Sequence, residues 1–260
     1  MGIQLQPSLK ALQIERGQLG RCRLAFGLFW AGFLIQLLPI LFLIDESAIP
    51  DPTAESKPVT REEVILDQVV FILPSILLTL SASVLNIVVA RTTRWRQASW
   101  LLMATLLSQI ALAIVGIIAL GPSYIPAEGE PLLTRIAFHG VALALPLGWW
   151  FIVVIIGEFA MACRETVLLG QVERVSFGVL ASIAAIMMYF GWTLNTPVTS
   201  DDDVTIFLKA FHSLMQVIVF FWLLFPIARA YMVCTILIRR IDEVGRVVKE
   251  TNQPEESATK

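Results

Sequence analysis

The sequence predicts an all-α membrane protein, a polytopic bundle of about six transmembrane helices with both termini in the cytoplasm. Its composition and the alternation of its charges support this fold class. Of the 260 residues, 57% are hydrophobic and only 15% are charged, whereas about 25% are charged in an ordinary soluble domain. The excess apolar residues come in repeated runs of about 20 or more, which is the length that crosses a bilayer.

The apolar runs define a six-span membrane domain at residues 24–238. The spans are expected at about 24–44, 69–90, 99–120, 136–163, 175–194 and 204–228. The last apolar pattern is too long for one crossing, so we expect its helix to leave the membrane and continue to residue 249. A polar cytoplasmic segment, residues 1–23, precedes the first span. The polar tail, residues 250–260, is expected to be disordered.

Lysine and arginine residues alternate between the two sides of the expected bundle. Three of them lie in the loops after the first, third and fifth spans, and fourteen of the 19 lie in four other segments. Those segments are 1–23, 91–97, 164–174 and 239–260. Because cytoplasmic segments carry the excess of positive charge, the alternation predicts six spans with both ends inside. The short loops favour a multi-pass protein of the bacterial cytoplasmic (inner) membrane.

Glu158 is the one acidic residue set deep in an apolar run. A carboxylate below the headgroups costs at least a few kcal/mol unless it is paired, protonated or near water. Arg229 lies at a similar depth in the sixth span, so we expect Glu158 to pair with it. Arg91 and Arg94 are the alternative partners. We interpret the pair as a structural latch, and a proton or ion relay in a transporter is the alternative.

Polar side chains recur on one face of the second span at helical spacing. They are Ser75, Thr79, Ser83 and Asn86. Such a face favours close helix packing, because small residues let helices approach and polar side chains bond across the gap. A polar pore lining is the alternative, and Gln36, Gln109 and Gln216 would join it. A transport path would require Asn86, Gln109 and Glu158 to converge.

Motifs of known catalytic and cofactor sites are missing from the sequence. The three cysteines have neither metal-binding nor disulfide spacing. His139 and His212 are the only histidines, and we expect them to hydrogen-bond to neighbours near the outer ends of their spans; axial ligation of haem is the alternative. We therefore expect no enzyme activity, no metal and no cofactor. No basic patch with interleaved aromatic residues indicates a nucleic-acid partner.

The leading functional interpretation is a non-catalytic integral membrane protein that acts through packing or partner contacts. Its expected partners are the lipid bilayer, a second copy of the chain or another membrane protein. The alternative is a small transporter or channel with a polar intramembrane path near Glu158. The candidate intramembrane polar or ion-pair residues are Glu158, Arg229, Asn86 and Gln109.

Overall fold

The computed structural model describes residues 16–42, 61–120, 132–195 and 203–251, and nearly all of them are helical. The six long helices are α1 (Arg16–Phe42), α3 (Leu73–Val89), α4 (Thr93–Leu120), α5 (Leu132–Cys163), α6 (Thr166–Asn195) and α7 (Asp203–Thr251). A short helix α2 (Arg61–Leu66) and a π-helical segment η3 (Asp67–Ile72) lead directly into α3. The described part of the chain contains no strand, which confirms the all-α prediction.

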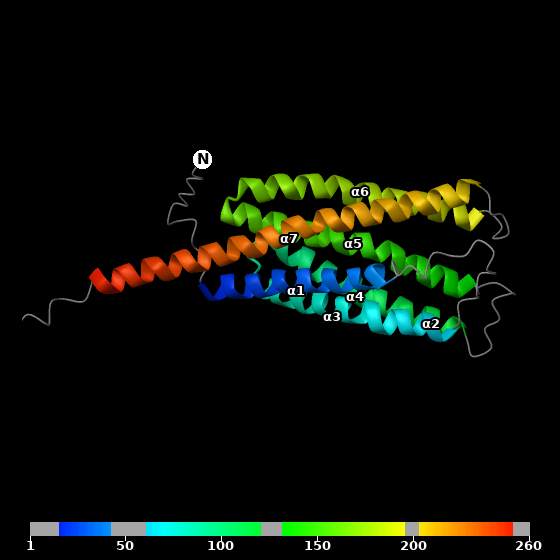
Figure 1. Ribbon diagram of the computed structural model, residues 1–260, viewed down its shortest axis with the longest axis horizontal. Coiled ribbons are helices and arrows are strands. Elements are labelled where there is room, and N and C mark those ends of the chain that lie inside the picture. Colours follow the sequence, from blue (N-terminus) through cyan, green and yellow to red (C-terminus); the bar gives the residue numbers. More distant parts are fainter. Residues whose placement is uncertain (1–15, 43–60, 121–131, 196–202, 252–260) are drawn as a thin grey trace, which may run out of the picture.

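The six long helices form a closed ring. Contacts run from α1 to α3, α4, α5, α6 and α7 in turn, and α7 contacts α1 again. Neighbours in the ring run in opposite directions (Figure 1). The turns between α3 and α4 and between α5 and α6 lie at the same end, which we call the turn end. α7 continues beyond the other helices at this end (Figure 1).

Within the described ranges, four helices are long and apolar enough to cross a membrane, namely α4, α5, α6 and α7. This finding supports a membrane protein in general terms. α4, α5 and α6 begin four to nine residues before the expected spans, because the residues that precede each expected span are already helical. Residues 1–15 of the N-terminal segment lie outside the described residues. So does the expected disordered tail, apart from its first two residues, which belong to α7.

Pro74 accounts for the π-helical segment before α3. A proline in a helix has no N–H to donate, and its ring clashes with the carbonyl four residues earlier. Widening the preceding turns to the π pattern moves that carbonyl away. The widened segment ends at Ile72, beside the cavity described below.

Aromatic rings fill the middle of the helix ring in two groups. Nearer the turn end, the ring centroid of Phe159 lies 5.0 Å from that of Phe26 and 6.3 Å from that of Trp95. We call these three residues the turn-side cluster. Further from the turn end lies the central cluster of Phe33, Trp149 and Phe220. The two clusters bring α1, α4, α5 and α7 into one buried core.

The polar face of α3 packs against α1. A Cβ placed on Gly32 of α1 would lie 3.2 Å from both the Ser75 carbonyl oxygen and Thr79 Oγ1, so the two helices approach closely here. Thr79 Oγ1 donates to the Ser75 carbonyl at 2.8 Å, and Ser83 Oγ donates to the Thr79 carbonyl at 2.8 Å. These hydroxyls are therefore satisfied within their own helix, as membrane helices commonly arrange.

Candidate functional site

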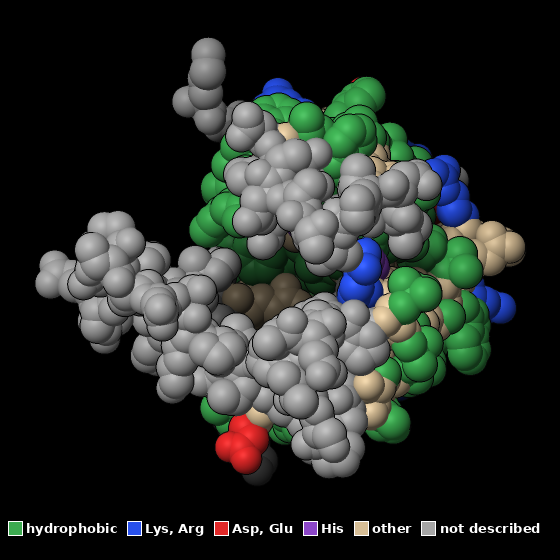
Figure 2. All heavy atoms as spheres, turned by 90° about the vertical axis from the view of Figure 1, so that its right-hand side faces the viewer, with side chains coloured by type: hydrophobic (Ala, Val, Ile, Leu, Met, Phe, Trp, Pro, Cys, Tyr) green, Lys and Arg blue, Asp and Glu red, His purple; other side chains and the backbone are tan. Residues whose placement is uncertain are grey.

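A cavity of about 510 Å³ lies inside the helix ring, in the half away from the turn end. Residues of α1, η3, α3, α4, α5 and α7 line it. Figure 2 faces this end of the molecule and shows a hollow near the centre of the view. Trp149 and Phe220 of the central cluster form part of the lining, so this cluster bounds the cavity toward the turn end. The volume falls in the range of small-molecule sites.

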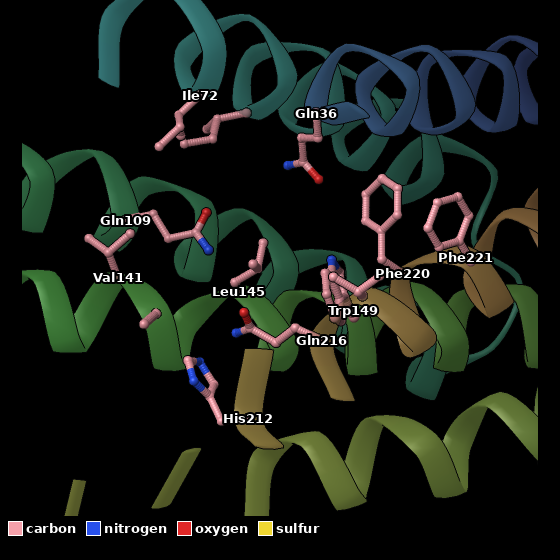
Figure 3. A pocket seen from close by; sticks show the side chains of 13 residues that line it. Gln36, Ile72, Gln109, Val141, Leu145, Trp149, His212, Gln216, Phe220 and Phe221 are labelled. Atoms are coloured by element: carbon pink, nitrogen blue, oxygen red, sulfur yellow. The ribbon is translucent and has the colours of Figure 1, made fainter. Parts of the chain in front are cut away.

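Three glutamines enter this apolar cavity from three different helices: Gln36 from α1, Gln109 from α4 and Gln216 from α7 (Figure 3). Gln36 Nε2 donates to Ser75 Oγ at 3.0 Å, and Ser75 Oγ donates to the Ile72 carbonyl at 2.9 Å. The Gln36 carboxamide is thereby fixed in orientation, with its oxygen left to accept another hydrogen bond.

Gln109 and Gln216 differ from Gln36 because neither hydrogen-bonds to another described residue. Gln109 is only 4% exposed, but its amide atoms are not among the buried side-chain atoms that lack a partner, so they reach the open space of the cavity. Its carboxamide faces the cavity (Figure 3). The amide is therefore placed to bond to a polar group inside the cavity.

The cavity lining carries no Asp, Glu, Lys or Arg among the described residues. His212 is its one titratable side chain, and the imidazole stacks on Tyr189 of α6 with a ring-centroid distance of 5.5 Å. His139 meets the same tyrosine edge-on at 6.1 Å. Both histidines thus pack against Tyr189 of α6. Because its lining has no acidic side chain, lysine or arginine among the described residues, the cavity favours an uncharged ligand.

Glu158 lies at the turn end, separated from this cavity. Thr92 Oγ1 donates to Glu158 Oε2 at 2.9 Å, and Arg94 Nε lies 3.4 Å from Glu158 Oε1. Thr92 also accepts the N–H of Trp95 at 3.0 Å and so caps α4. Of the arginines expected to pair with Glu158, Arg94 does so and Arg229 does not.

Arg229 pairs instead with Glu165, whose Oε1 lies 2.7 Å from Arg229 Nη2. Glu165 belongs to the two-residue turn that ends α5. The turn is a Schellman motif: Arg164 adopts a left-handed conformation with φ 56°, and the Glu165 N–H donates to the Ala160 carbonyl at 2.9 Å. The ion pair therefore ties the α5–α6 turn to α7.

The sequence analysis missed Glu165 because this residue stands just beyond the apolar run. The sequence signal for Glu165 was indirect, since a half-buried guanidinium on α7 favours a carboxylate at its own depth. Glu165 lies at the depth of Arg229 because the turn between α5 and α6 is tight.

The polar residues expected to converge do not do so. Gln109 faces the cavity, whereas Glu158 lies nearer the turn end, next to Phe159 of the turn-side cluster. Asn86 is buried on α3, where its Nδ2 donates to the Ala82 carbonyl at 2.8 Å. Among the described residues, no continuous polar path joins the cavity to the ion pairs of Glu158 and Glu165.

Among the described residues, no group of three or more His, Cys, Asp or Glu side chains could hold a metal ion. The fold and the site together define an all-helical protein of the membrane class with an uncharged, amide-lined cavity. No protein-family model, curated protein or solved structure matches the chain.

Proposed function

We propose that the chain is a six-span membrane protein that binds a small neutral molecule in its central cavity without catalysing a reaction. The observation that supports this most directly is the buried Gln109 carboxamide, which faces the cavity beside Gln36 and Gln216. We expect both termini to lie in the cytoplasm of a bacterial cell. Contacts with a membrane partner or with a second copy of the chain stay a prediction.

The closed ring supports six spans. α1 and α3 lie between α7 and α4 in the ring, so they share a layer with four helices that are apolar enough to cross a membrane. α1 has 27 residues, and α3 with 17 residues is extended by the 6 residues of η3. At about 1.5 Å per residue, each helix is long enough to pass through about 30 Å of hydrocarbon.

This topology predicts which loops are accessible from outside the cell. In a chain whose native cysteines are replaced by alanine, we expect Ser56→Cys and Ser123→Cys to react with a membrane-impermeant maleimide on intact cells. Ser257→Cys should react only after the cells are lysed. Labelling of Ser257→Cys on intact cells would overturn the cytoplasmic C-terminus. Protection of either of the first two variants would overturn the six-span arrangement.

The lining determines the chemistry of the expected ligand. Trp149 and Phe220 favour a flat, apolar body, and the amides favour carbonyl or hydroxyl oxygens on it. Charged molecules are disfavoured because no formal countercharge lines the cavity among the described residues. The ligand class is therefore a neutral, lipid-soluble molecule with one or two polar oxygens.

The two aromatic clusters favour binding over permeation. The central cluster bounds the cavity toward the turn end, and all six rings of the two clusters are buried. A transporter or channel that uses Glu158 would require these rings to part. That alternative is less well supported, because the central cluster lies between the cavity and the level of Glu158 on α5.

Gln109→Leu is expected to lower ligand binding by about fivefold to a hundredfold, because one hydrogen bond in an apolar site contributes about 1–3 kcal/mol. The measurement is native mass spectrometry of the purified protein titrated with a short-chain quinone. This probe is neutral, stacks on aromatic rings and carries two carbonyl oxygens. The melting temperature of the variant should not fall, because the substitution removes a buried amide without a described partner.

Gln97→Leu is the matched control for this experiment. Gln97 is an exposed glutamine on the same helix as Gln109 and does not line the cavity. The control should bind the quinone as the wild type does. Equal loss of the quinone adduct in both variants, or no adduct with the wild type, would contradict a neutral-ligand site at Gln109.

A further inference from the structure

A second concave site lies on the outer surface between α6 and α7. The two helices approach closely at Gly178, where a Cβ would lie 3.1 Å from Val219. Toward the turn end, a groove of about 370 Å³ opens between them. The groove is lined by polar residues of α6 at one side, Gln171 and Arg174, and by aromatic residues of α7 at the other.

Arg174 gives this groove its charge. The side chain is exposed, and among the described residues it forms no ion pair. Glu165, the buried carboxylate just before the start of α6, is already paired with Arg229. Glu173 precedes Arg174 in the sequence but lines a different pocket, between α5 and α6. The Arg174 guanidinium is thus available to an anion from outside the bundle.

The aromatic side of the groove faces away from the bundle. Trp222 and Phe225 are both large, apolar and exposed. In a membrane this surface contacts acyl chains, and tryptophan is favoured near the headgroups. The arginine and the amide suit the headgroup phosphate of a phospholipid, and the exposed aromatic rings suit its acyl chain.

We propose that this groove binds an anionic phospholipid of the inner leaflet. Arg174 takes the phosphate through paired N–H donors, the Gln171 carboxamide donates to a phosphate oxygen, and an acyl chain lies along Trp222 and Phe225. The inference rests on the proposed membrane topology. Arg174 stands eight residues after the start of α6, about 12 Å along the helix axis, so the same topology places it near the inner headgroups.

The test compares two lipids that differ only in the headgroup. The purified protein is mixed in detergent with equal amounts of phosphatidylglycerol and phosphatidylcholine of the same acyl chains, and retained lipid is counted by native mass spectrometry. The wild type should retain phosphatidylglycerol in excess. Arg174→Gln should lower the phosphatidylglycerol adduct at least fivefold and leave the phosphatidylcholine adduct unchanged.

Arg164→Gln is the matched control, because Arg164 is also an exposed arginine near the turn end but does not line the groove. It should keep the preference of the wild type. Equal retention of the two lipids by the wild type would overturn the proposal, as would an equal loss in both variants.

Arg174→Lys separates a binding role from a folding role. This variant keeps the charge but loses the paired donors, so it should retain part of the phosphatidylglycerol preference. If Arg174→Gln does not fold, Arg174→Lys tests the proposal instead. A preference for phosphatidylglycerol as strong as that of the wild type would overturn the paired N–H contact of Arg174 with the phosphate. A wrong topology would be detected separately by maleimide labelling, and the lipid comparison would still be measurable.

Discussion

Glu165→Gln is expected to lower the free energy of unfolding by about 2–3 kcal/mol. The substitution leaves the Arg229 guanidinium without its carboxylate, and this side chain is only 31% exposed. Breaking a fully buried pair costs about 3–5 kcal/mol, and the partial exposure of Arg229 reduces that figure. Arg229 Nε is already buried without a partner in the described part of the chain, so the remaining charge has few other contacts. Thermal unfolding of the purified protein in detergent measures the loss.

Glu158→Gln is the matched control, because Glu158 is as buried as Glu165 and lies at the same end of the bundle. Its partner Arg94 is 71% exposed, so the guanidinium reaches water when the carboxylate is removed. The glutamine oxygen can still accept the Thr92 hydroxyl. We therefore expect a loss of only about 0–1 kcal/mol. Equal losses for the two variants would contradict a difference that depends on the exposure of the arginine.

This comparison also bears on the two interpretations of Glu158. A structural latch should contribute to stability, and the exposed partner limits how much it contributes. If Glu158→Gln folds normally and lowers quinone binding or a transport signal, the relay alternative gains support. If the variant changes neither stability nor binding, Glu158 serves mainly as a partner for the cap residue Thr92.

The helices were predictable from the sequence because each apolar run is long enough to specify one. Their contacts were harder to predict, since a contact depends on the rotation of each helix about its own axis. Gln36, Gln109 and Gln216 were all visible as polar residues in apolar runs. Nothing in the sequence indicates that these three, rather than the polar face of α3, line the cavity. The polar face of α3 does not line the cavity because it packs against α1 at Gly32, where the lack of a side chain permits a close helix contact.

The ion pairs show a similar limit. Depth along the helix predicts which charges lie at one level of the membrane, and by this measure Glu158 and Arg229 are suitable partners. In the structure each of the two has another partner. Arg94, near the cap of α4, lies beside Glu158, and Glu165, in the α5–α6 turn, lies beside Arg229. The partners of Glu158 and Glu165 are set by the geometry of the two short turns at this end of the bundle. Turn geometry depends on tertiary packing, which the periodicity of the sequence does not describe.

Phe159→Ala is expected to have the largest effect of any single substitution in the core, about 3–5 kcal/mol of unfolding free energy. The Phe159 side chain is 0% exposed and meets Phe26 of α1 and Trp95 of α4. Its removal would open a void where three helices meet, and the surrounding rings are too rigid to fill that void. Thermal unfolding in detergent measures the cost, and the purified variant should elute as the wild type does.

Phe177→Ala provides the comparison. Phe177 lies on α6, adjacent to α5 in the ring, and is 70% exposed, so its ring contacts lipid or detergent. Detergent replaces the lost contacts, and the expected cost is about 0–1 kcal/mol. A large difference in unfolding free energy between the two variants requires that side chains of α1, α4 and α5 pack together in the interior of the ring. Equal costs would mean that detergent reaches Phe159, in which case the aromatic clusters do not separate the cavity from the turn end and permeation becomes the better interpretation.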